Sequence, residues 1–290
     1  LGPRINAGGR VGKCSHGANL LLNKNVKSSF KLASELDQYN KERQMLEGDL
    51  LKKILDQTKH YTNDPVLILS GENWHEGIIG IVAARLKDKF NKPVILISLN
   101  DNIGKASARS IVGFDIGSVI IGATQEKILI KGGGHKMAGG FSIQIDNIDK
   151  FKDFVFKKFR GINEDLKSEK PLLLDSVIAP SAVNLEFFNK VALLSPFGSG
   201  NPEPKFVVEN VKTLNGKIVG EKHVKSVLIG QDGSTIKSIA FNATENVLGS
   251  YLLKKNNKSF NIAGKLSLNE WKGQSNVEFI IDDISVNKTF

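Results

Sequence analysis

Short apolar runs alternate with helical segments between residues 65 and 159, and this alternation constrains the fold more than any other feature of the sequence. Apolar segments of strand length stand at residues 65–70, 93–99 and 141–145, and a shorter, more polar strand is predicted at 104–110. Segments with helical periodicity lie at residues 77–90, about 115–130 and about 147–159. Strands that alternate with helices indicate a sheet covered by helices. We therefore predict an α/β domain in this part of the chain.

The residues before this domain predict a loop followed by two helices. Residues 1–16 carry four glycines in their first twelve positions, which is typical of a loop that brings backbone amides close to a ligand. A short helix capped by Ser15 is expected to reach Leu22, and a longer helix to span about 28–58. The longer helix has one apolar face and one charged face, so we interpret it as a connector with a solvated side.

Beyond residue 160 the pattern becomes mainly β. Residues 161–170 predict a polar linker, followed by a strand at 172–178, a helix at about 182–194 and an irregular Pro- and Gly-rich segment at 196–204. Further strands are predicted near residues 206–214, 217–220, 224–229, 236–241, 259–268 and 276–286, with a short helix near 245–253. Several strands, one interposed helix and two more strands fit an OB-like barrel. The predicted divisions are 1–60, 61–165 and 166–290.

The charge balance favours an anionic partner. The chain has 40 Lys and Arg against 30 Asp and Glu, a formal net charge of +10 and a pI near 9.5. The alternative is a protein that is basic without binding nucleic acid, and charge alone does not separate the two. One cysteine, Cys14, excludes an internal disulfide framework and a metal site with several Cys ligands, so we expect the reducing cytoplasm.

The chain shows no sign of membrane contact, and it starts without an initiating Met. No apolar run reaches the ~18 residues that a membrane span needs. The first residues, Leu1 to Arg4, do not form a signal peptide. Because the chain starts at Leu1, we expect it to be part of a longer protein.

Several catalytic motifs are absent from the sequence. Each Gly-Lys pair lacks the Ser or Thr that completes a P-loop, which argues against a P-loop nucleotidase. His75-Glu76 begins like a zinc-protease helix, but Ile79 stands where the second His is required. The tightest acidic pair, Asp282-Asp283, would point to opposite faces of a strand. No acid cluster suited to two divalent metals remains.

The segment from Lys131 to Gly140 is the strongest positive signal. Gly132, Gly133 and Gly134 can take positive φ and present several N–H groups to one anion, and His135 can add a side-chain donor. A phosphate is the expected ligand. The alternative is a tight turn between a helix and a strand with an incidental His.

Three weaker signals point to the same chemistry. Ser107 and Arg109 would share one face of a strand and suit two phosphate oxygens, although exposed strand residues of this kind are common. Arg4, Asn6 and Arg10 stand in the glycine-rich N-terminal segment, which fits either an anion site or contact with a neighbouring domain.

The third weaker signal is the start of the helix at residue 77, which favours an anion through its dipole and its free N–H groups. Gly77 and Gly80 would allow close packing of this helix on the sheet. His75, just before the helix, could contact a ligand, and a packed core His beside Trp74 is the alternative.

The barrel segment is basic as well. Residues 205–290 contain twelve lysines and eight acidic residues, with Phe241 and Trp271 among them. Lysines and aromatic rings together can bind the phosphates of a single strand and stack its bases. Any solvated small barrel could show the same charge balance, so this signal is weak alone.

Five motifs in order resemble the RecJ family of bacterial single-stranded-DNA-specific exonucleases, in the DHH phosphoesterase superfamily. They are Gly2-Pro3-Arg4-Ile5-Asn6-Ala7, Trp74-His75 with Gly77-Ile78-Ile79-Gly80, Ala106-Ser107-Ala108-Arg109-Ser110, Gly133-Gly134-His135, and Pro196-Phe197-Gly198 with Gly200-Asn201-Pro202-Glu203-Pro204. The resemblance covers essentially the whole chain. It implies a DHH-associated α/β domain at 61–165, preceded by the end of a DHH domain and a connector helix, and followed by an OB domain.

The resemblance also implies a function, a 5′→3′ exonuclease acting on single-stranded DNA with Mn²⁺ or Mg²⁺. The family's metal ligands are Asp and His residues of the DHH domain, and this sequence contains no Asp-His-His. We therefore name no catalytic residue and no metal ligand, and we expect this chain alone to be inactive without its missing N-terminal DHH domain. The sequence identifies no further protein partner.

The family's phosphate and strand contacts carry over to Arg4, Asn6, Arg10, Ser107, Arg109 and His135. One alternative is a fragment that binds single-stranded nucleic acid without hydrolysing it. Another is a DHH-family phosphodiesterase for oligonucleotides or small phosphoesters, but a short substrate would not need the predicted barrel. A tRNA-synthetase accessory domain could share the glycine–His element, but it should lack the motif at residues 4–10.

Overall fold

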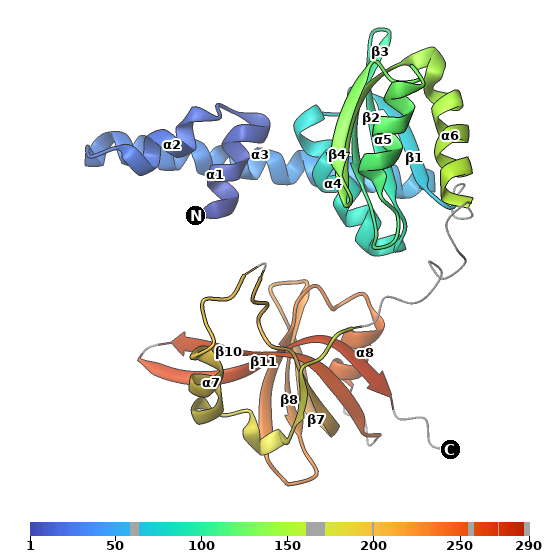
Figure 1. Cartoon of the computed structure of the whole chain (residues 1–290). Coiled ribbons are helices and arrows are strands. Elements are labelled where there is room, and N and C mark those ends of the chain that lie inside the picture. Colours follow the sequence, from blue (N-terminus) through green and yellow to red (C-terminus); the bar gives the residue numbers. More distant parts are fainter. Residues whose placement is uncertain (59–63, 161–171, 199, 255–257, 272, 287–290) are drawn as a thin grey trace. The chain divides into compact units, whose positions relative to one another are not determined.

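The computed structural model describes residues 1–58, 64–160, 172–198, 200–254, 258–271 and 273–286 (Figure 1). The side chains of Trp271 and Gln274 also lie outside the described part. The chain divides into two compact units, Leu1–Lys170 and Pro171–Phe290. The linker predicted at residues 161–170 falls on residues that are not described.

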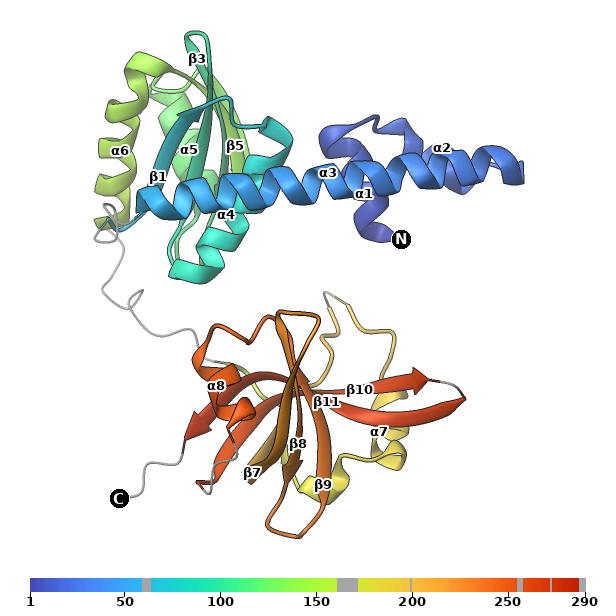
Figure 2. The ribbon, with the colours of Figure 1, turned by 180° about the vertical axis from the view of Figure 1, so that it is seen from behind.

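Three helices form the N-terminal end of the first unit. α1 (Gly2–Val11) and α2 (Ser15–Leu22) both pack against α3 (Val26–Thr58), one long helix that is seen along its length in Figure 2. The predicted helices ending at residues 22 and 58 are confirmed. The cap predicted at Ser15 is wrong, because Ser15 is the first residue of α2 and the N-cap is Cys14, without a side-chain hydrogen bond.

The loop predicted at residues 1–16 is wrong, because most of it is helix α1. Proline fits the first turn of a helix, where its missing N–H removes no hydrogen bond, and Pro3 stands there. The glycines serve close packing. A Cβ at Gly12 would lie 2.4 Å from the ring of Tyr39, and a Cβ at Gly8 would lie 3.1 Å from Leu36. Two of the four glycines, Gly8 and Gly12, therefore allow the close approach of α1 to α3, whereas a Cβ at Gly2 would meet nothing within 4 Å.

A five-stranded sheet forms the centre of the first unit. Its strands, in spatial order, are β1 (Leu67–Glu72), β2 (Val94–Asn100), β3 (Ile103–Arg109), β5 (Ala138–Gln144) and β4 (Lys131–His135). β1 and β2 are parallel, and the other neighbours are antiparallel. The four strands predicted from the apolar runs are all present. β4 was not predicted.

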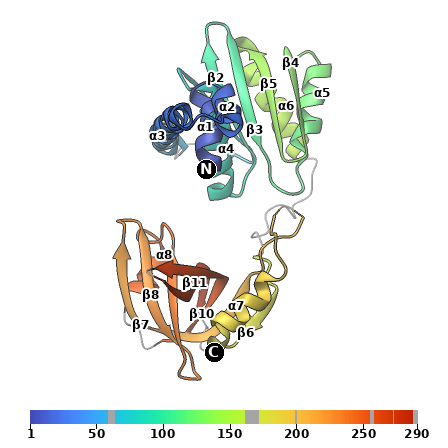
Figure 3. The ribbon, with the colours of Figure 1, turned by 90° about the vertical axis from the view of Figure 1, so that its left-hand side faces the viewer.

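Helices cover the two faces of this sheet unequally (Figure 3). Val94 and Leu96 of β2 pack with α3 and α4 (Glu76–Phe90), whereas Ile95 and Ile97 pack with α5 (Ile116–Gln125) and α6 (Ile148–Arg160). α4 contacts β2 and β3, while β4 and β5 pack against α5 on the other face. A Cβ at Gly133 of β4 would meet nothing within 4 Å. The α4 side of the sheet is therefore open over β5 and β4.

The second unit is a closed five-stranded barrel. Its strands are β7 (Phe206–Val219), β8 (His223–Ile229), β9 (Thr235–Ala240), β10 (Phe260–Trp271) and β11 (Gln274–Val286). The sheet runs β7-β8-β9-β11-β10, and β10 pairs with β7 to close it. α8 (Val247–Leu253) connects β9 to β10, β6 (Ser176–Ile178) pairs with β7, and α7 (Leu185–Ala192) packs on β10 and β11. This arrangement confirms the OB-like barrel.

One strand of the barrel differs from the prediction. The strands expected at residues 206–214 and 217–220 are a single strand, β7, whose register shifts between Thr213 and Asn215. The Asn215-Gly216 pair is typical of a turn, which is why the sequence predicted a break. Here a Cβ at Gly216 would lie 1.9 Å from the carbonyl oxygen of Leu252. Glycine is required because the backbone at the end of α8 passes close to the strand.

Candidate nucleic-acid interface

The first candidate site begins at the N-terminus of α4. The Nδ1 atom of His75 accepts a hydrogen bond from the backbone N–H of Gly77 at 3.1 Å, so His75 caps the helix. Its side chain is exposed and lines a hollow of about 260 Å³ next to α3. Ser107 does not line this hollow. His75 is thus neither a core residue nor part of the Ser107 hollow.

Ser107 and Arg109 lie on β3 directly opposite α4. The Nη1 atom of Arg109 donates to Ser107 Oγ at 3.1 Å and to the carbonyl of Ala108 at 2.7 Å. A Cβ at Gly80 of α4 would lie 2.9 Å from Ser107 Oγ and 3.0 Å from Arg109 Nη2. The missing side chain of Gly80 therefore makes room for the hydroxyl and the guanidinium, and the close helix–sheet packing expected at this glycine is confirmed.

A second arginine reaches the same place from α1. Arg10 Nη1 donates to the carbonyl of Gly77 at 3.1 Å, and a Cβ at Gly77 would lie 2.3 Å from the Arg10 carbonyl oxygen. Burial lowers the pKa of the Arg109 guanidinium below its usual value, and the charge of Arg10 lowers it further. Two guanidinium groups of like charge thus converge beside a helix N-terminus, where an anion would relieve their repulsion.

The strand register places further polar residues beside this pair. Directly paired residues of antiparallel strands point to the same face of a sheet. Arg109 pairs with Ala138, which pairs with His135. Ser107 pairs with Gly140, which pairs with Gly133. The structure therefore brings Ser107, Arg109, Gly133 and His135 onto one face of one sheet.

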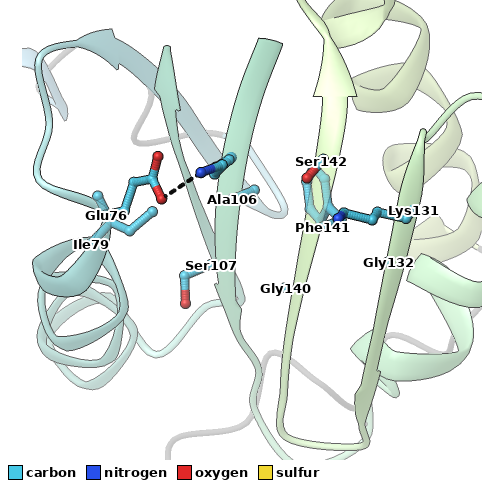
Figure 4. A pocket seen from close by; sticks show the side chains of 10 residues that line it. Glu76, Ile79, Ala106, Ser107, Lys131, Gly132, Gly140, Phe141 and Ser142 are labelled. Carbon is cyan, nitrogen blue, oxygen red and sulfur yellow. Dashed lines mark hydrogen bonds and ion pairs between the residues drawn. The ribbon is translucent and has the colours of Figure 1, made fainter. Parts of the chain in front are cut away.

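A hollow of about 580 Å³ occupies this face (Figure 4). Its walls come from α4 and from strands β3, β5 and β4, and its lining residues are Glu76, Ile79, Lys105, Ala106, Ser107, Lys131, Gly132, Gly140, Phe141 and Ser142. Glu76 and Ser142 were not among the sequence candidates. Ser142 reaches the hollow through the antiparallel pairing of β3 with β5, and Glu76 reaches it from the start of α4. One sequence does not reveal either placement.

The triple glycine does not form the predicted anion loop. Gly132, Gly133 and Gly134 belong to strand β4, and none of them has a positive φ. A Cβ at Gly132 would lie 2.7 Å from Ile120 of α5. A Cβ at Gly134 would lie 2.4 Å from the Ala138 carbonyl oxygen. Glycine is required here for close approach, and the N–H groups of an extended strand do not converge on one point.

The other candidates lie at different distances from the hollow. His135 ends β4, and its Nδ1 accepts a 3.4 Å hydrogen bond from the N–H of Met137. Two strand spacings, about 10 Å, separate its Cα from that of Arg109. Arg4 pairs with Asp37 of α3 at 2.6 Å, and neither Arg4 nor Asn6 lines the hollow. Hydrogen bonds from Lys41 and Arg4 lower the pKa of Asp37.

The barrel carries a second candidate surface. A hollow of about 550 Å³ lies over β7, β8, β9, β10 and β11 and is lined by Asn215, Lys217, Lys225, Ser226, Val227, Lys237, Asn269, Asn276 and Glu278. Lys237 donates to Asn276 Oδ1 at 3.1 Å. Three lysines and three asparagines in one hollow can bind phosphates and hydrogen-bond to bases.

A buried carboxylate holds part of this surface in place. Glu278 accepts from Lys225 Nζ at 2.6 Å and from Asn269 Nδ2 at 3.0 Å. Burial alone would raise its pKa, but these hydrogen bonds outweigh burial and lower the pKa of Glu278. At neutral pH the carboxylate is therefore charged, and it neutralises Lys225 while leaving Lys217 and Lys237 on the rim.

An aromatic pair is also exposed on the barrel, outside the residues that line this hollow. His223 and Phe241 pack edge to face with ring centroids 5.1 Å apart, and Phe241 is 52% exposed. An exposed ring can stack on a base. Trp271, the other aromatic candidate, has a side chain outside the described part.

Residues 63–161 match the DHHA1 domain, and residues 174–283 match the RecJ OB domain. The single-stranded-DNA-specific exonuclease RecJ of Bacillus subtilis (strain 168) is 28% identical over 297 residues, which are 99% of this chain and 36% of the relative. The RecJ of Escherichia coli (strain K12) is 31% identical over 298 residues, 98% of this chain and 50% of the relative.

The chain is homologous to the C-terminal part of RecJ. The crystal structure of Thermus thermophilus RecJ in complex with Mg²⁺ superposes with a TM-score of 0.77 and 27% identity, over 99% of this chain and 43% of that one. RecJ from the same organism in complex with Mn²⁺ gives the same TM-score at 28% identity. The family and fold class inferred from the motifs are confirmed. The chain spans at most half the length of these RecJ proteins.

The described residues contain neither a metal-binding group nor a membrane-spanning helix. Among them no group of three or more His, Cys, Asp or Glu side chains could hold a metal ion. None of the helices in the described ranges is long and apolar enough to cross a membrane.

Proposed function

We propose that this chain supplies the surfaces that bind the terminal phosphate and the strand in a RecJ-type 5′→3′ exonuclease specific for single-stranded DNA. The observation that carries this proposal is the convergence of Arg109, Ser107 and Arg10 beside the N-terminus of α4. Two guanidinium groups, a hydroxyl and a helix N-terminus form a site for an anion with several oxygens. The names of the RecJ relatives support a single DNA strand as the ligand, and in this proposal the anion is the 5′-terminal phosphate of that strand.

Each part of the site has a defined role in the proposed mechanism. Arg109 neutralises the charge of the terminal phosphate, and Ser107 donates its hydroxyl to a phosphate oxygen. Arg10 fixes the position of α1 against α4 and adds positive charge. Gripping the end of the strand fixes which phosphodiester lies at the reaction centre, and such positioning is a large part of catalysis.

The barrel is the proposed binding surface for the rest of the strand. Its rim lysines would contact phosphates, and the exposed ring of Phe241 would stack on a base. His135, on the open face of the sheet, would donate to the DNA from its imidazole. Arg4 and Asn6 stay in the proposal only through the resemblance, because their positions on α1 do not line the hollow.

The divalent metal belongs to the proposed function of the full-length protein. Mn²⁺ or Mg²⁺ would activate a water and neutralise charge on the scissile phosphodiester. No group of the described residues is suited to such an ion, and in the proposed function the ion is held by the N-terminal DHH domain. Because its substrate would be DNA, the full-length enzyme would act in the cytoplasm.

The proposal is tested by measuring whether a variant of Arg109 loses its preference for a 5′-phosphorylated strand over a 5′-hydroxyl strand. We expect Arg109→Ala to weaken binding of a 5′-phosphorylated single strand roughly tenfold, because a hydrogen bond to a charged group is lost. Binding of the same strand with a 5′-hydroxyl should change much less. Lys150→Ala, on α6 behind the sheet, is the matched control and should leave both affinities unchanged. An equal loss for both strands would remove Arg109 from a phosphate site.

A second assay separates binding from hydrolysis. This chain is expected to bind 5′-labelled oligonucleotides without shortening them when Mn²⁺ is added. Digestion that requires Mn²⁺ and stops with a chelator would show instead that residues of this chain hold the metal.

A further inference from the structure

The hollow beside Ser107 carries a row of donors that the proposed terminal-phosphate site does not use. Lys105 pairs directly with Ser142, and Ser142 pairs directly with Lys131, so the three side chains point to one face from β3, β5 and β4. All three line the hollow that Ser107 also lines. Neighbouring strands lie about 4.8 Å apart, so these donors form a row across the sheet.

This row and the contacts proposed for the DNA strand lie on opposite sides of Ser107. Along β3, Lys105 and Arg109 are each two residues from Ser107, in opposite directions. Arg109 shares its row, through Ala138, with His135, which contacts the DNA in the proposed function. A strand whose terminal phosphate is bound at Ser107 therefore leaves on the His135 side. The Lys105 row lies beyond the 5′ end of that strand.

The distance from Ser107 to the Lys105 row suits an extension of the 5′ end by linked phosphates. Two residues on a strand span about 6.8 Å. The two P–O–P bridges of a triphosphate reach nearly as far. The stem of a lysine is long and flexible, so its ammonium can make up the difference.

The space beside Ser107 is free of side chains from β5 and β4. Gly140 and Gly133 occupy the positions that pair with Ser107 on these two strands. A Cβ at Gly133 would meet nothing within 4 Å. The hollow of about 580 Å³ lies within the range of small-ligand pockets and has room for more than one phosphate.

The charges around the row fit an added anion. Lys105 Nζ lies 2.9 Å from the Glu76 carboxylate, and the two side chains are 58% and 41% exposed. An exposed ion pair of this kind contributes little, so Lys105 exchanges its partner at small cost. Figure 4 shows Glu76 on one wall of the hollow and Lys131 extending from β4 toward Ser142 on the other. Two lysines thus stand against one carboxylate among the described lining residues.

We propose that Lys105, Ser142 and Lys131 form a site for the additional phosphates of a single strand whose 5′ end carries a triphosphate. The inference rests on the proposed function, in which the phosphate linked to the first sugar binds Ser107 and Arg109. The second and third phosphates lie over the Lys105 row. The chain thus accepts strand ends that a pocket closed at the first phosphate would exclude.

The test compares three oligothymidines that differ only at the 5′ end, which carries a hydroxyl, a monophosphate or a triphosphate. The full chain is titrated with each of them in the presence of a chelator, so that no divalent ion covers the triphosphate. We expect the triphosphate strand to bind roughly tenfold more tightly than the monophosphate strand, because further charge-assisted hydrogen bonds form. In the double variant Lys105→Ala/Lys131→Ala this gain should disappear.

A second double variant is the control for net charge. Lys150→Ala/Lys157→Ala also removes two exposed lysines, from α6 on the other face of the sheet. It should keep the tenfold gain.

The outcomes separate this inference from the proposed function. The triphosphate site is wrong if the unaltered chain binds triphosphate and monophosphate strands equally, if the gain persists in Lys105→Ala/Lys131→Ala, or if the control loses it as well. Free deoxythymidine triphosphate that binds as tightly as the triphosphate strand would assign the row to a nucleotide and contradict a site for strand ends. The terminal site is tested independently, by the effect of Arg109→Ala on monophosphate and hydroxyl strands.

Discussion

At the scale of single residues, Gly80 leaves space for the side chains of Ser107 and Arg109, which form the proposed phosphate site. A Cβ at this position would fall within 3.0 Å of both Ser107 Oγ and Arg109 Nη2. Both atoms end side chains that can turn away, so the added methyl would displace the phosphate donors without breaking the backbone. A glycine inside a helix otherwise destabilises it by about 1 kcal/mol relative to alanine.

Gly80→Ala should therefore change binding and stability in opposite directions. We expect the variant to lose most of its preference for a 5′-phosphorylated strand, while its melting temperature stays the same or rises. Gly48→Ala is the matched control, because Gly48 is also inside a helix and a Cβ there would meet nothing within 4 Å. That control should gain stability and keep the preference. A Gly80→Ala variant that binds like the original chain would separate Ser107 and Arg109 from phosphate binding.

At the scale of elements, the sequence predicted the apolar strands well and the glycine-rich elements poorly. Apolar periodicity identified β1, β2, β3 and β5 because each of them buries side chains in the sheet. β4 and α1 carry glycines where a strand or a helix lies close to a neighbour. The composition of such a segment resembles that of a turn, and only the neighbouring element shows why glycine is required.

The residues of the candidate site in the first unit were predicted only in part, because some of them come together through neighbouring elements. The sequence identified Ser107 and Arg109 because residues two positions apart on a strand share a face. It did not identify Ser142 or Glu76, which reach the hollow through the pairing of β3 with β5 and through the start of α4. Residues that a fold brings together from separate elements leave no local pattern in one sequence.

A buried carboxylate joins α3 to α4 beside the apolar core that the two helices share. Glu47 of α3 has 2% of its side chain exposed and lies 2.5 Å from Arg43 Nη1 and 2.5 Å from Arg85 Nε of α4. Removing one partner of a buried ion pair destabilises a protein by about 3–5 kcal/mol, and because Arg85 is 58% exposed we expect about 2 kcal/mol.

Glu47→Ala should accordingly lower the free energy of unfolding of the first unit. Fluorescence of Trp74, which is 5% exposed in this unit, reports its unfolding in urea once Trp271 is replaced by Phe. Glu186→Ala removes an exposed ion pair with Lys190 in the second unit and is the control. Equal midpoints for the two variants would show that the Glu47 pair does not hold α4 on α3.

At the scale of the whole molecule, the chain joins two binding surfaces of different kinds. In the proposed function, the first unit binds the end of a strand at Ser107, which lines the hollow, and at Arg109, which donates to the Ser107 hydroxyl. The second presents a hollow of rim lysines and amides that suits any stretch of a strand. Recognition of the end and retention of the strand are thus separate properties, and variants should be able to change one without the other.

Salt dependence separates the two surfaces. Each phosphate contact to a single strand contributes about −0.7 to the slope of log K against log salt, so Lys217→Ala/Lys237→Ala should reduce the magnitude of the slope by about 1.4. Both lysines are exposed, whereas Lys225 is left in place because Glu278 depends on it. The preference for a 5′-phosphate should not change, since it belongs to the first unit. Titrations of one oligonucleotide at several salt concentrations measure both quantities, with Lys150→Ala as control. An unchanged slope in the double variant would move the strand to another face of the barrel.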